Sequence, residues 1–320
     1  MNFIGDVSIK GNFSSTLIGE KMSLLVLGSL ALDTIETPSR SVTEVPGGSA
    51  SYAALSASYF ANPYIIGIIG SDFPDSISAL FRDHQVHLEG VEVKEGKTFR
   101  WGGRYSENFD DRTTLFTHLN VFEDFKPTIP SAFKNASTIL LANIHPGLQL
   151  EVLDQVKGDG LVILDTMNLW INTAHEDLMK VIGRSNILVI NNEESLMLTG
   201  ERQYIRAAAK LADMGPDWII IKKGQHGAMM FHEGQVFTIP ALALDEVSDP
   251  TGAGDSFVGA LAGYLEQSRD RSFDNMKLGL VFGTILASYC VEDFSVDGIT
   301  YLEEADLDDR YDELVTMSQF

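Results

Sequence analysis

The sequence predicts an α/β fold built around a largely parallel sheet. Short apolar runs of strand length alternate with helical patterns along most of the 320 residues, as in sheets whose strands are covered by helices on both faces. One stretch, residues 91–121, has no helical pattern and consists of extended segments. We therefore expect one α/β domain that carries a small additional β element.

The apolar runs place the buried strands, and periodic apolar positions place the helices between them. Strands are expected at residues 24–27, 64–69, 138–141, 161–164, 187–190 and 218–221. Helices are expected at residues 50–60, 75–85, 148–156, 207–214, 255–267 and 276–291. The acidic stretch 303–309 is typical of the solvated face of a helix.

The extended region is predicted to form a lid. Residues 97–105 and 113–117 are extended and are separated by Asn108 and two aspartates, which is typical of a hairpin. The segment 33–45 is similarly extended and can pair with it. We expect a β-lid formed by about 33–45 and 91–121, because such elements close over ligands and exclude water. A surface hairpin without a role is the alternative.

The start of the chain does not have the pattern of a secretion signal. Residues 1–21 lack both a basic n-region and a continuous apolar run, and Met22 directly precedes the first predicted strand. We interpret residues 1–21 as an N-terminal extension or leader and residues 22–320 as the domain. No apolar run approaches the roughly 20 residues that cross a bilayer, so no membrane partner is expected and the predicted location is the cytoplasm.

The charge of the chain excludes one class of partner. Lysines and arginines number 23 against 45 aspartates and glutamates, which gives a formal net charge of -22. Such a field repels phosphate backbones, so nucleic acid is not an expected partner. A small phosphate ligand remains compatible, because backbone amides and Mg²⁺ supply local positive charge. The single cysteine, Cys290, excludes an internal disulfide.

The stretch Asp249-Pro250-Thr251-Gly252-Ala253-Gly254-Asp255 carries the most chemistry. Gly252 and Gly254 allow several backbone N–H groups to point at one ligand, and the helix that follows directs its positive end to the same place. The segment Gly252, Ala253 and Gly254 is therefore predicted to be an anion hole for a transferring phosphoryl group. Asp255, in the first helical turn, is the predicted catalytic base.

The glycine spacing in this sequence does not match the dinucleotide-binding fingerprint or the P-loop. A dinucleotide-binding fingerprint needs a third glycine where Phe257 stands, and the Gly96-Lys97-Thr98 triplet lies one residue too far from Gly90 for a P-loop. A plain aspartate cap on a glycine turn remains the structural alternative for Asp255.

Pro250–Asp255 and the helix after it resemble the C-terminal signature of the ribokinase/PfkB family of carbohydrate and nucleoside kinases. Further features follow in the family's order over nearly the whole chain from about Met22: Asp33 after a first strand, the pair Gly47-Gly48, Asn191 with Glu194, and Gly224 with Gly227. The resemblance implies a ribokinase-like three-layer αβα sandwich with a β-lid, ATP and Mg²⁺ as cofactors, and a homodimer formed through the lid.

On the acceptor side, the resemblance implies that Asp33, Gly47 and Gly48 bind the substrate. A carboxylate after a strand's carboxyl end can hold two adjacent hydroxyls, and a glycine pair permits close approach of a polyol. Each has a structural alternative as a turn residue. Trp101 in the lid can stack on a base or sugar face or pack the lid or a dimer contact.

On the nucleotide side, the resemblance implies roles for five residues: Asn191, Glu194, Lys223, Gly224 and Gly227. Glu194 is expected to hold Mg²⁺ through water, with a favourable position at a helix N-terminus as the alternative. Gly224 and Gly227 lie along the nucleotide or merely form a hairpin turn. Asp249 is expected beside a monovalent cation such as K⁺.

Three polar residues at strand ends are weaker candidates. Asp165 and Asn168 follow one predicted strand, although Asn168 can equally cap the next turn. His145 follows another strand, and the His145-Pro146 pair is more often structural than catalytic.

Tyr52 stands where many family members have a substrate-binding asparagine, and one hydroxyl cannot replace an amide's donor and acceptor. The predicted function is therefore an ATP-dependent kinase acting on a hydroxyl of a sugar or sugar derivative, with the particular sugar open. A nucleoside kinase is the alternative, favoured if Trp101 and Phe99 face the pocket, and a ligand sensor without activity is a second alternative.

Overall fold

The computed structural model describes residues 23–109 and 111–319. Residues 1–21, interpreted above as an extension, and Met22 lie outside the described residues. Within them no helix is long and apolar enough to cross a membrane.

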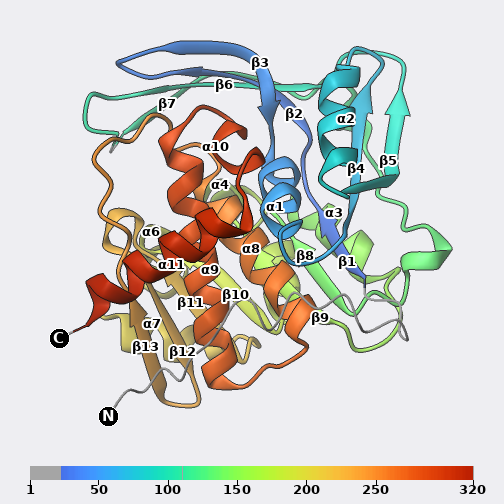
Figure 1. Ribbon diagram of the computed structural model, residues 1–320. Coiled ribbons are helices and arrows are strands. Elements are labelled where there is room, and N and C mark those ends of the chain that lie inside the picture. Colours follow the sequence, from blue (N-terminus) through green and yellow to red (C-terminus); the bar gives the residue numbers. More distant parts are fainter. Residues whose placement is uncertain (1–22, 110, 320) are drawn as a thin grey trace.

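A large sheet forms the middle layer of the molecule (Figure 1). Its order is β13-β12-β11-β10-β9-β8-β1-β4-β5, and neighbouring strands are parallel except that β12 runs against β11 and β13. The bounds are β1 Leu24–Leu27, β4 Pro63–Gly70, β5 His87–Lys94, β8 Thr138–Leu141, β9 Leu161–Asp165, β10 Ile187–Asn191, β11 Trp218–Lys222, β12 Ala228–His232 and β13 Gln235–Ile239. The largely parallel sheet expected from the apolar runs is confirmed.

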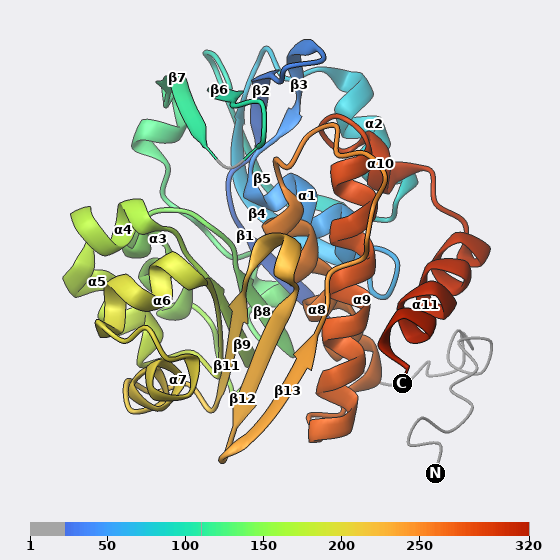
Figure 2. The same ribbon diagram turned by 90° about the vertical axis from the view of Figure 1, so that its left-hand side faces the viewer.

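Helices cover both faces of this sheet (Figure 2). One face carries α3 Pro146–Leu153, α4 Asn168–Thr173, α5 His175–Ile182, α6 Asn192–Thr199 and α7 Tyr204–Ala212. The other carries α1 Ser49–Ala57, α2 Asp75–Asp83, α8 Ala253–Ser268, α9 Phe273–Glu292, α10 Asp297–Thr300 and α11 Glu304–Ser318. Alternate strand residues enter the two cores: Leu24 and Val26 pack on the α8 side, Leu25 and Leu27 on the α3 side.

Helices α1 and α8 pack unusually closely, which fixes the place of the predicted site. A Cβ on Gly259 would lie 2.2 Å from the carbonyl oxygen of Ala53, and one on Gly263 would lie 2.6 Å from that of Ala57. Only glycine permits this approach of two backbones. As a result, the glycine pair before α1 and the glycine loop before α8 lie next to each other, at the N-terminal ends of the two helices.

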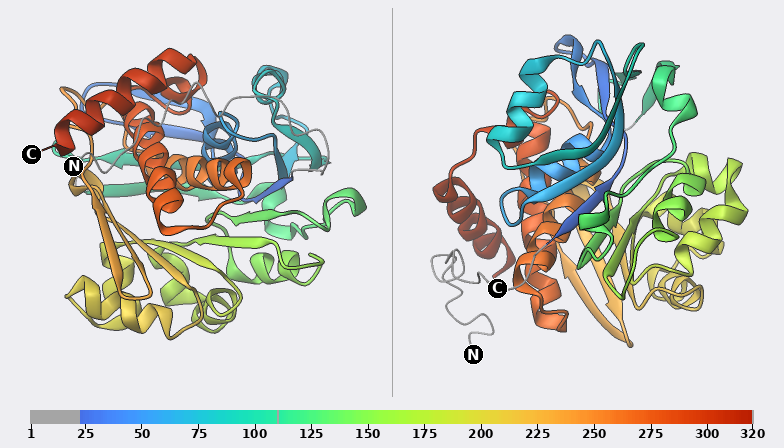
Figure 3. Two further views of the ribbon diagram at one scale, coloured as in Figure 1. Left: turned by 60° about the horizontal axis from the view of Figure 1, so that its bottom comes forward. Right: turned by 90° about the vertical axis from the view of Figure 1, so that its right-hand side faces the viewer.

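A second sheet forms the lid, seen at the top of Figure 1 and as a separate layer in Figure 3. Its order is β3-β2-β6-β7, with bounds β2 Ala31–Glu36, β3 Ser41–Gly47, β6 Phe99–Tyr105 and β7 Arg112–His118. The two extended segments do pair, through parallel β2 and β6. One part of the predicted range is wrong: Val91–Lys94 is the end of β5, which pairs with β4 as the edge of the large sheet. A half-exposed edge strand has the same alternating pattern as a lid strand, so the sequence could not separate them.

Several strands run one residue beyond the predicted end and finish on a polar side chain. These residues are Asp165 on β9, Asn191 on β10 and Lys222 on β11. The backbone pairing continues through them, with Asn191 directly opposite Lys222. The three side chains therefore stand together at the carboxyl edge of the sheet, where open α/β sheets bind ligands.

Candidate active site

The loop before α8 has the conformation that an anion hole requires. Gly252 is the N-cap residue with φ of 80°, a left-handed conformation that favours glycine, and Ala253, Gly254 and Asp255 form the first turn of α8. No side chain caps this helix end. The Ala253 amide makes a long hydrogen bond of 3.4 Å to the Pro250 carbonyl, so the amides of Gly252 and Gly254 are the ones most available to an anion.

Asp255 lies beside this loop with one oxygen free. Its Oδ1 is buried and has no hydrogen-bond partner. Burial, and next the charge of Asp165, raise the pKa of Asp255 to about 7, while Lys222 and Arg112 act to lower it. A carboxylate with a pKa near neutrality and an unused oxygen is suited to accept a proton from a hydroxyl.

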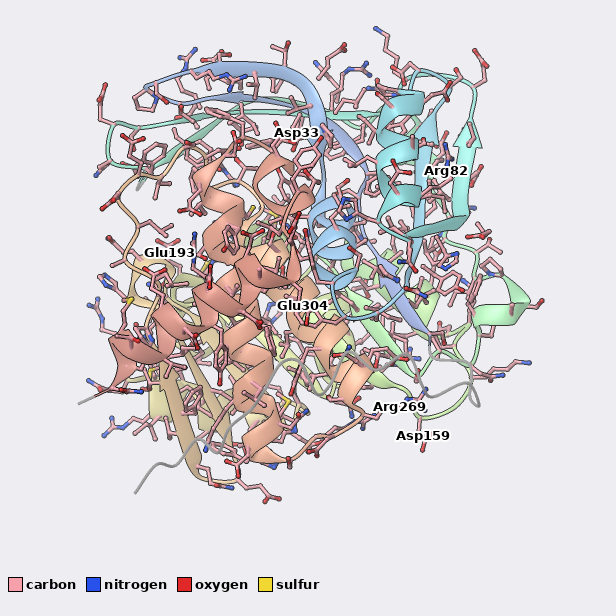
Figure 4. All side chains as sticks on the ribbon, in the orientation of Figure 1. Asp33, Arg82, Asp159, Glu193, Arg269 and Glu304 are labelled. Atoms are coloured by element: carbon pink, nitrogen blue, oxygen red, sulfur yellow. The ribbon has the colours of Figure 1, made fainter. Side chains whose placement is uncertain are left out.

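Asp33, on β2, lies where the lid meets the core (Figure 4). Its side chain is buried, and Oδ1 has no hydrogen-bond partner. Burial is the main cause that raises its pKa to about 8, opposed by a hydrogen bond from the backbone of Gly48. A Cβ on Gly47 would lie 2.0 Å from Asp33 Oδ2, and Gly48 has φ of 86°. Both glycines of the predicted pair are therefore needed to seat this carboxylate.

Tyr52, on α1, joins the acceptor side to the anion hole. It is fully buried, and its hydroxyl has no partner. Its ring lies under Gly252, where a Cβ would come within 2.2 Å of Cδ1. Burial, with the nearby charges of Asp33 and Asp249, raises the pKa of Tyr52 well above its usual value. The phenol is therefore a neutral donor within the pocket.

An ion pair that the sequence did not indicate lies on the other side of the loop. Lys222 Nζ is 2.8 Å from Asp165 Oδ1, and both side chains are largely buried. A Cβ on Gly254 would lie 3.0 Å from that same Nζ. Although burial opposes it, the acids Asp165 and Glu194 raise the pKa of Lys222, so the amine stays charged. The lysine predicted from the sequence is the neighbouring Lys223.

Asn191 and Glu194 form a capping box at the start of α6. The Asn191 side chain accepts from the Glu194 backbone at 2.9 Å, and Glu194 accepts from the Asn191 backbone at 2.8 Å and from its Nδ2 at 2.7 Å. Glu194 is buried, which raises its pKa to about 7 although Lys222 lowers it. Glu194 therefore has the helix N-terminal position given above as the alternative, and it also lies within electrostatic reach of Lys222 and Asp165.

The turn after β11 holds the other predicted nucleotide residues. Gly224 and Gly227 have φ of 57° and 79°, and the Lys223 backbone donates to the Gly227 carbonyl at 2.8 Å. The hairpin alternative accurately describes their local structure, since β11 and β12 pair across this turn. A Cβ on Gly224 would meet no atom within 4 Å, which leaves its surface open.

Asp249 braces the start of the anion-hole loop. It is buried, and it accepts from the backbone of Thr251 at 2.9 Å and of Ser295 at 3.2 Å. Burial is the main cause of its raised pKa. Both oxygens are therefore committed to holding the loop.

The lid reaches this loop directly. Tyr105, at the end of β6, forms a hydrogen bond of 2.9 Å between its hydroxyl and Thr251 Oγ1. Trp101 is directly opposite Asp33 in the lid sheet, and the Arg112 guanidinium lies 5.1 Å from the centre of its ring. Phe99 packs instead against Phe122, with ring centres 5.5 Å apart. Tyr105 and Arg112 were absent from the sequence-based site because only strand pairing brings them here.

Of the three weaker candidates, Asp165 lies in the ion pair described above, and the other two lie at helix starts. His145 is the N-cap of α3, and its Nδ1 accepts from the Gly147 backbone at 3.0 Å. Asn168 is the first residue of α4, whose N-cap is Met167, so the capping alternative for Asn168 is wrong.

The acids of the site fit a magnesium ion held mainly by phosphates and water. Within the described ranges no three acidic, histidine or cysteine side chains are grouped as a metal cage. Mg²⁺ bound with a nucleotide needs only one or two carboxylates and keeps several waters. Asp255 Oδ1 is free, and Glu194 and Asp165 lie in the same electrostatic cluster.

The sequence and the fold have counterparts in known proteins. The chain is 30% identical to the cytidine kinase of Thermococcus kodakarensis over 81% of this chain and 94% of that protein. It is 24% identical to the nucleoside kinase of Methanocaldococcus jannaschii over 86% of this chain and 92% of that one. The structure of Arabidopsis thaliana ribokinase complexed with ribose and ATP superposes with a TM-score of 0.71 at 20% identity, covering 90% of this chain and 98% of that chain.

The last comparison confirms the expected ribokinase-like fold with a lid. Residues 16–289 match the model of the pfkB family of carbohydrate kinases. The chain belongs to that family.

Proposed function

We propose that this protein is an ATP-dependent kinase that phosphorylates a hydroxyl of a small acceptor, either a nucleoside or a sugar. The observation that carries the proposal is Asp255: a carboxylate with a buried, unpartnered oxygen and a pKa raised to about 7, beside an uncapped helix N-terminus. The names of the two relatives above support nucleosides as the first acceptors to test.

The reaction follows from the placement of these groups. Asp33 accepts hydrogen bonds from acceptor hydroxyls, while Gly47 and Gly48 bind the acceptor beside it, since their lack of side chains leaves room for the Asp33 carboxylate. The attacking hydroxyl gives its proton to Asp255 as its oxygen bonds to the γ-phosphorus. The bond from that phosphorus to the bridging oxygen of ATP breaks, and ADP leaves with the electron pair.

Negative charge develops on the transferring phosphoryl group next to the glycine loop before α8. The amides of Gly252, Ala253 and Gly254 face the phosphoryl oxygens, and Lys222 flanks Gly254. When bound, Mg²⁺ would be held by the phosphates and by water near Glu194 and Asp165, and it supplies further neutralisation. Asn191, Lys223, Gly224 and Gly227 line the nucleotide side of the site in this proposal, and Trp101 lies on the acceptor side.

The test is ADP release from ATP across a panel of nucleosides, sugars and sugar phosphates, with Asp255→Asn as the matched control. The variant keeps the side-chain shape but cannot accept the proton, and positioned bases contribute about 10²–10⁴-fold. We expect kcat to fall by that order, with ATP affinity little changed. Equal turnover by both proteins would remove Asp255 from the mechanism, and acceptor binding without turnover in the wild type would indicate a sensor.

The proposal also includes a monovalent cation and a homodimer. A K⁺ ion near Asp249 would add order to a loop that this carboxylate already holds through Thr251. The outer strands β3 and β7 of the lid present sheet edges that can meet a second copy to form a homodimer. Sedimentation and the cation dependence of kcat test these two features separately.

A further inference from the structure

Arg112 is placed above the catalytic loop by the pairing of the lid strands. It is the first residue of β7 and lies directly opposite Tyr105, the last residue of β6. Since the Tyr105 hydroxyl contacts Thr251 of the loop, Arg112 lies at the same end of the hairpin as that contact, close enough for its charge to act on Asp255. Trp101 supports the guanidinium from one side, 5.1 Å from the ring centre.

No acid in the described part of the chain forms an ion pair with Arg112, unlike its neighbours in the lid. Arg100 is 3.0 Å from Glu44 and 2.8 Å from Asp72, and Arg104 is 2.6 Å from Glu36. In a protein with a formal charge of -22, an exposed arginine without an acidic partner keeps donors available beyond its side-chain hydrogen bond with Tyr105. That donor set matches phosphate oxygens.

The charge of Arg112 acts on both reacting sides of the pocket. It lowers the pKa of Asp255 and also the pKa of Asp33, which come from α8 and β2. The guanidinium, which belongs to the lid, therefore lies within electrostatic reach of both the base and the acceptor carboxylate, which border one space. That space is where the phosphoryl group passes to the acceptor hydroxyl in the proposed reaction.

The existing cation at the loop is already engaged. Lys222 forms an ion pair with Asp165 at 2.8 Å, so part of its charge is neutralised before ATP arrives. The phosphoryl group in transfer carries negative charge on three oxygens. A second, unpaired cation on the opposite side would stabilise this group more than it stabilises bound ATP, and this difference accelerates the reaction.

We propose that Arg112 is a catalytic residue of the lid, which donates hydrogen bonds to the transferring phosphoryl group opposite the amides of the anion hole. This inference rests on the proposed kinase function. Arg112 remains charged throughout and exchanges no proton. Because Arg112 comes from the lid, transfer would be fast only when the lid lies over the loop.

The kinetic test compares Arg112→Gln and Arg112→Lys with Arg104→Gln. Arg104 is a matched control because it lies in the same lid sheet but is held by Glu36, with a side chain 61% exposed. We expect Arg112→Gln to lower kcat at least tenfold with little change in the KM for ATP. Lysine should restore part of the rate, and Arg104→Gln should behave as wild type.

A pH profile separates this role from a structural one. Besides Arg112, the charged groups around Asp255 are Asp165 on β9, Lys222 on β11 and Asp33 on β2, and these remain in the variant. Loss of the guanidinium should move the acid limb of kcat/KM to higher pH, since one charge that favours ionised Asp255 is gone. A higher acceptor KM with unchanged kcat and pH profile would overturn the proposal.

A binding test needs no acceptor and so distinguishes this inference from the function on which it rests. ADP with aluminium fluoride mimics the planar phosphoryl group, whereas ADP alone lacks it. In calorimetry, Arg112→Gln should bind the ADP–aluminium fluoride complex at least tenfold more weakly and ADP alone equally well. Equal affinities of both proteins for the mimic would overturn the role of Arg112, whatever the acceptor screen finds.

Discussion

Burial of Asp255 raises its pKa towards neutrality, and it does so by destabilising the ionised form that acts as the base. With a pKa of about 7 in the folded protein and a usual value of 3.8, it is protonated in the fold at pH 5 and ionised at pH 8. The active base is the ionised form, so kcat/KM should fall as the pH drops through about 7. A pH profile that stays flat down to pH 5 would contradict this assignment.

The same raised pKa predicts that Asp255→Asn stabilises the protein. A raised carboxyl pKa means that stability is lost as pH rises from the unfolded to the folded value. The neutral variant avoids this loss, so its advantage in Tm should grow between about pH 4 and pH 7 and stay constant above. Thermal unfolding at pH 4, 6 and 8 checks it, and an advantage independent of pH would point to packing instead.

The ion pair between Lys222 and Asp165 can be tested for separate contributions to stability and to activity. Lys222→Met leaves a buried carboxylate without its partner, which typically costs about 3–5 kcal/mol. Adding Asp165→Asn should restore most of that stability but not the activity, because the cation beside Gly254 is still missing. Denaturant unfolding and kcat of the three variants provide the measurement. Recovery of activity in the double variant would make the pair purely structural.

Sequence could identify Asp255 and its glycines because the loop and helix are contiguous in the chain. Lys222 was missed for a different reason: the apolar run ends at Ile221, so the predicted strand stopped there. The backbone ladder continues one residue further, opposite Asn191. A lysine directly after an apolar strand at the ligand edge was the available signal.

At the scale of elements, a hydrogen bond between Tyr105 and Thr251 joins the lid to the catalytic loop. We expect Tyr105→Phe and Thr251→Val each to lower kcat/KM for the acceptor by about 2- to 10-fold, the range of one neutral hydrogen bond. Since both remove the same contact, the double variant should be no worse than either alone. Additive losses in this double-mutant cycle would show that the contact does not couple the lid to the loop.

The existence of the lid was predictable, but its partners were not. Extended segments around residues 33–45 and 97–117 were visible in the sequence, whereas their parallel pairing through β2 and β6 joins residues some 68 positions apart. Tyr105 and Arg112 enter the site only through that pairing. A site built from long-range strand contacts cannot be obtained from local patterns.

At the scale of the whole molecule, the net charge of -22 sets how the protein responds to salt. Many acids lie far apart on the surface, as Glu193, Glu304 and Asp159 show in Figure 4. Self-repulsion of this kind opposes the compact state, and salt screens it over a Debye length that falls from about 10 Å at 0.1 M to 3 Å at 1 M. The Tm should therefore rise with ionic strength.

Changing the cation at constant ionic strength separates the general effect of charge screening from the effect of a specific ion bound near Asp249. Screening depends on ionic strength alone, so KCl, NaCl and choline chloride should raise Tm about equally. A K⁺ ion that orders the loop between Asp249 and Thr251 should instead raise kcat in KCl above that in choline chloride at the same ionic strength. Thermal unfolding and initial rates in the three salts give both results from one set of samples. Equal rates in KCl and choline chloride would leave Asp249 with the loop-bracing role that its two backbone contacts already show.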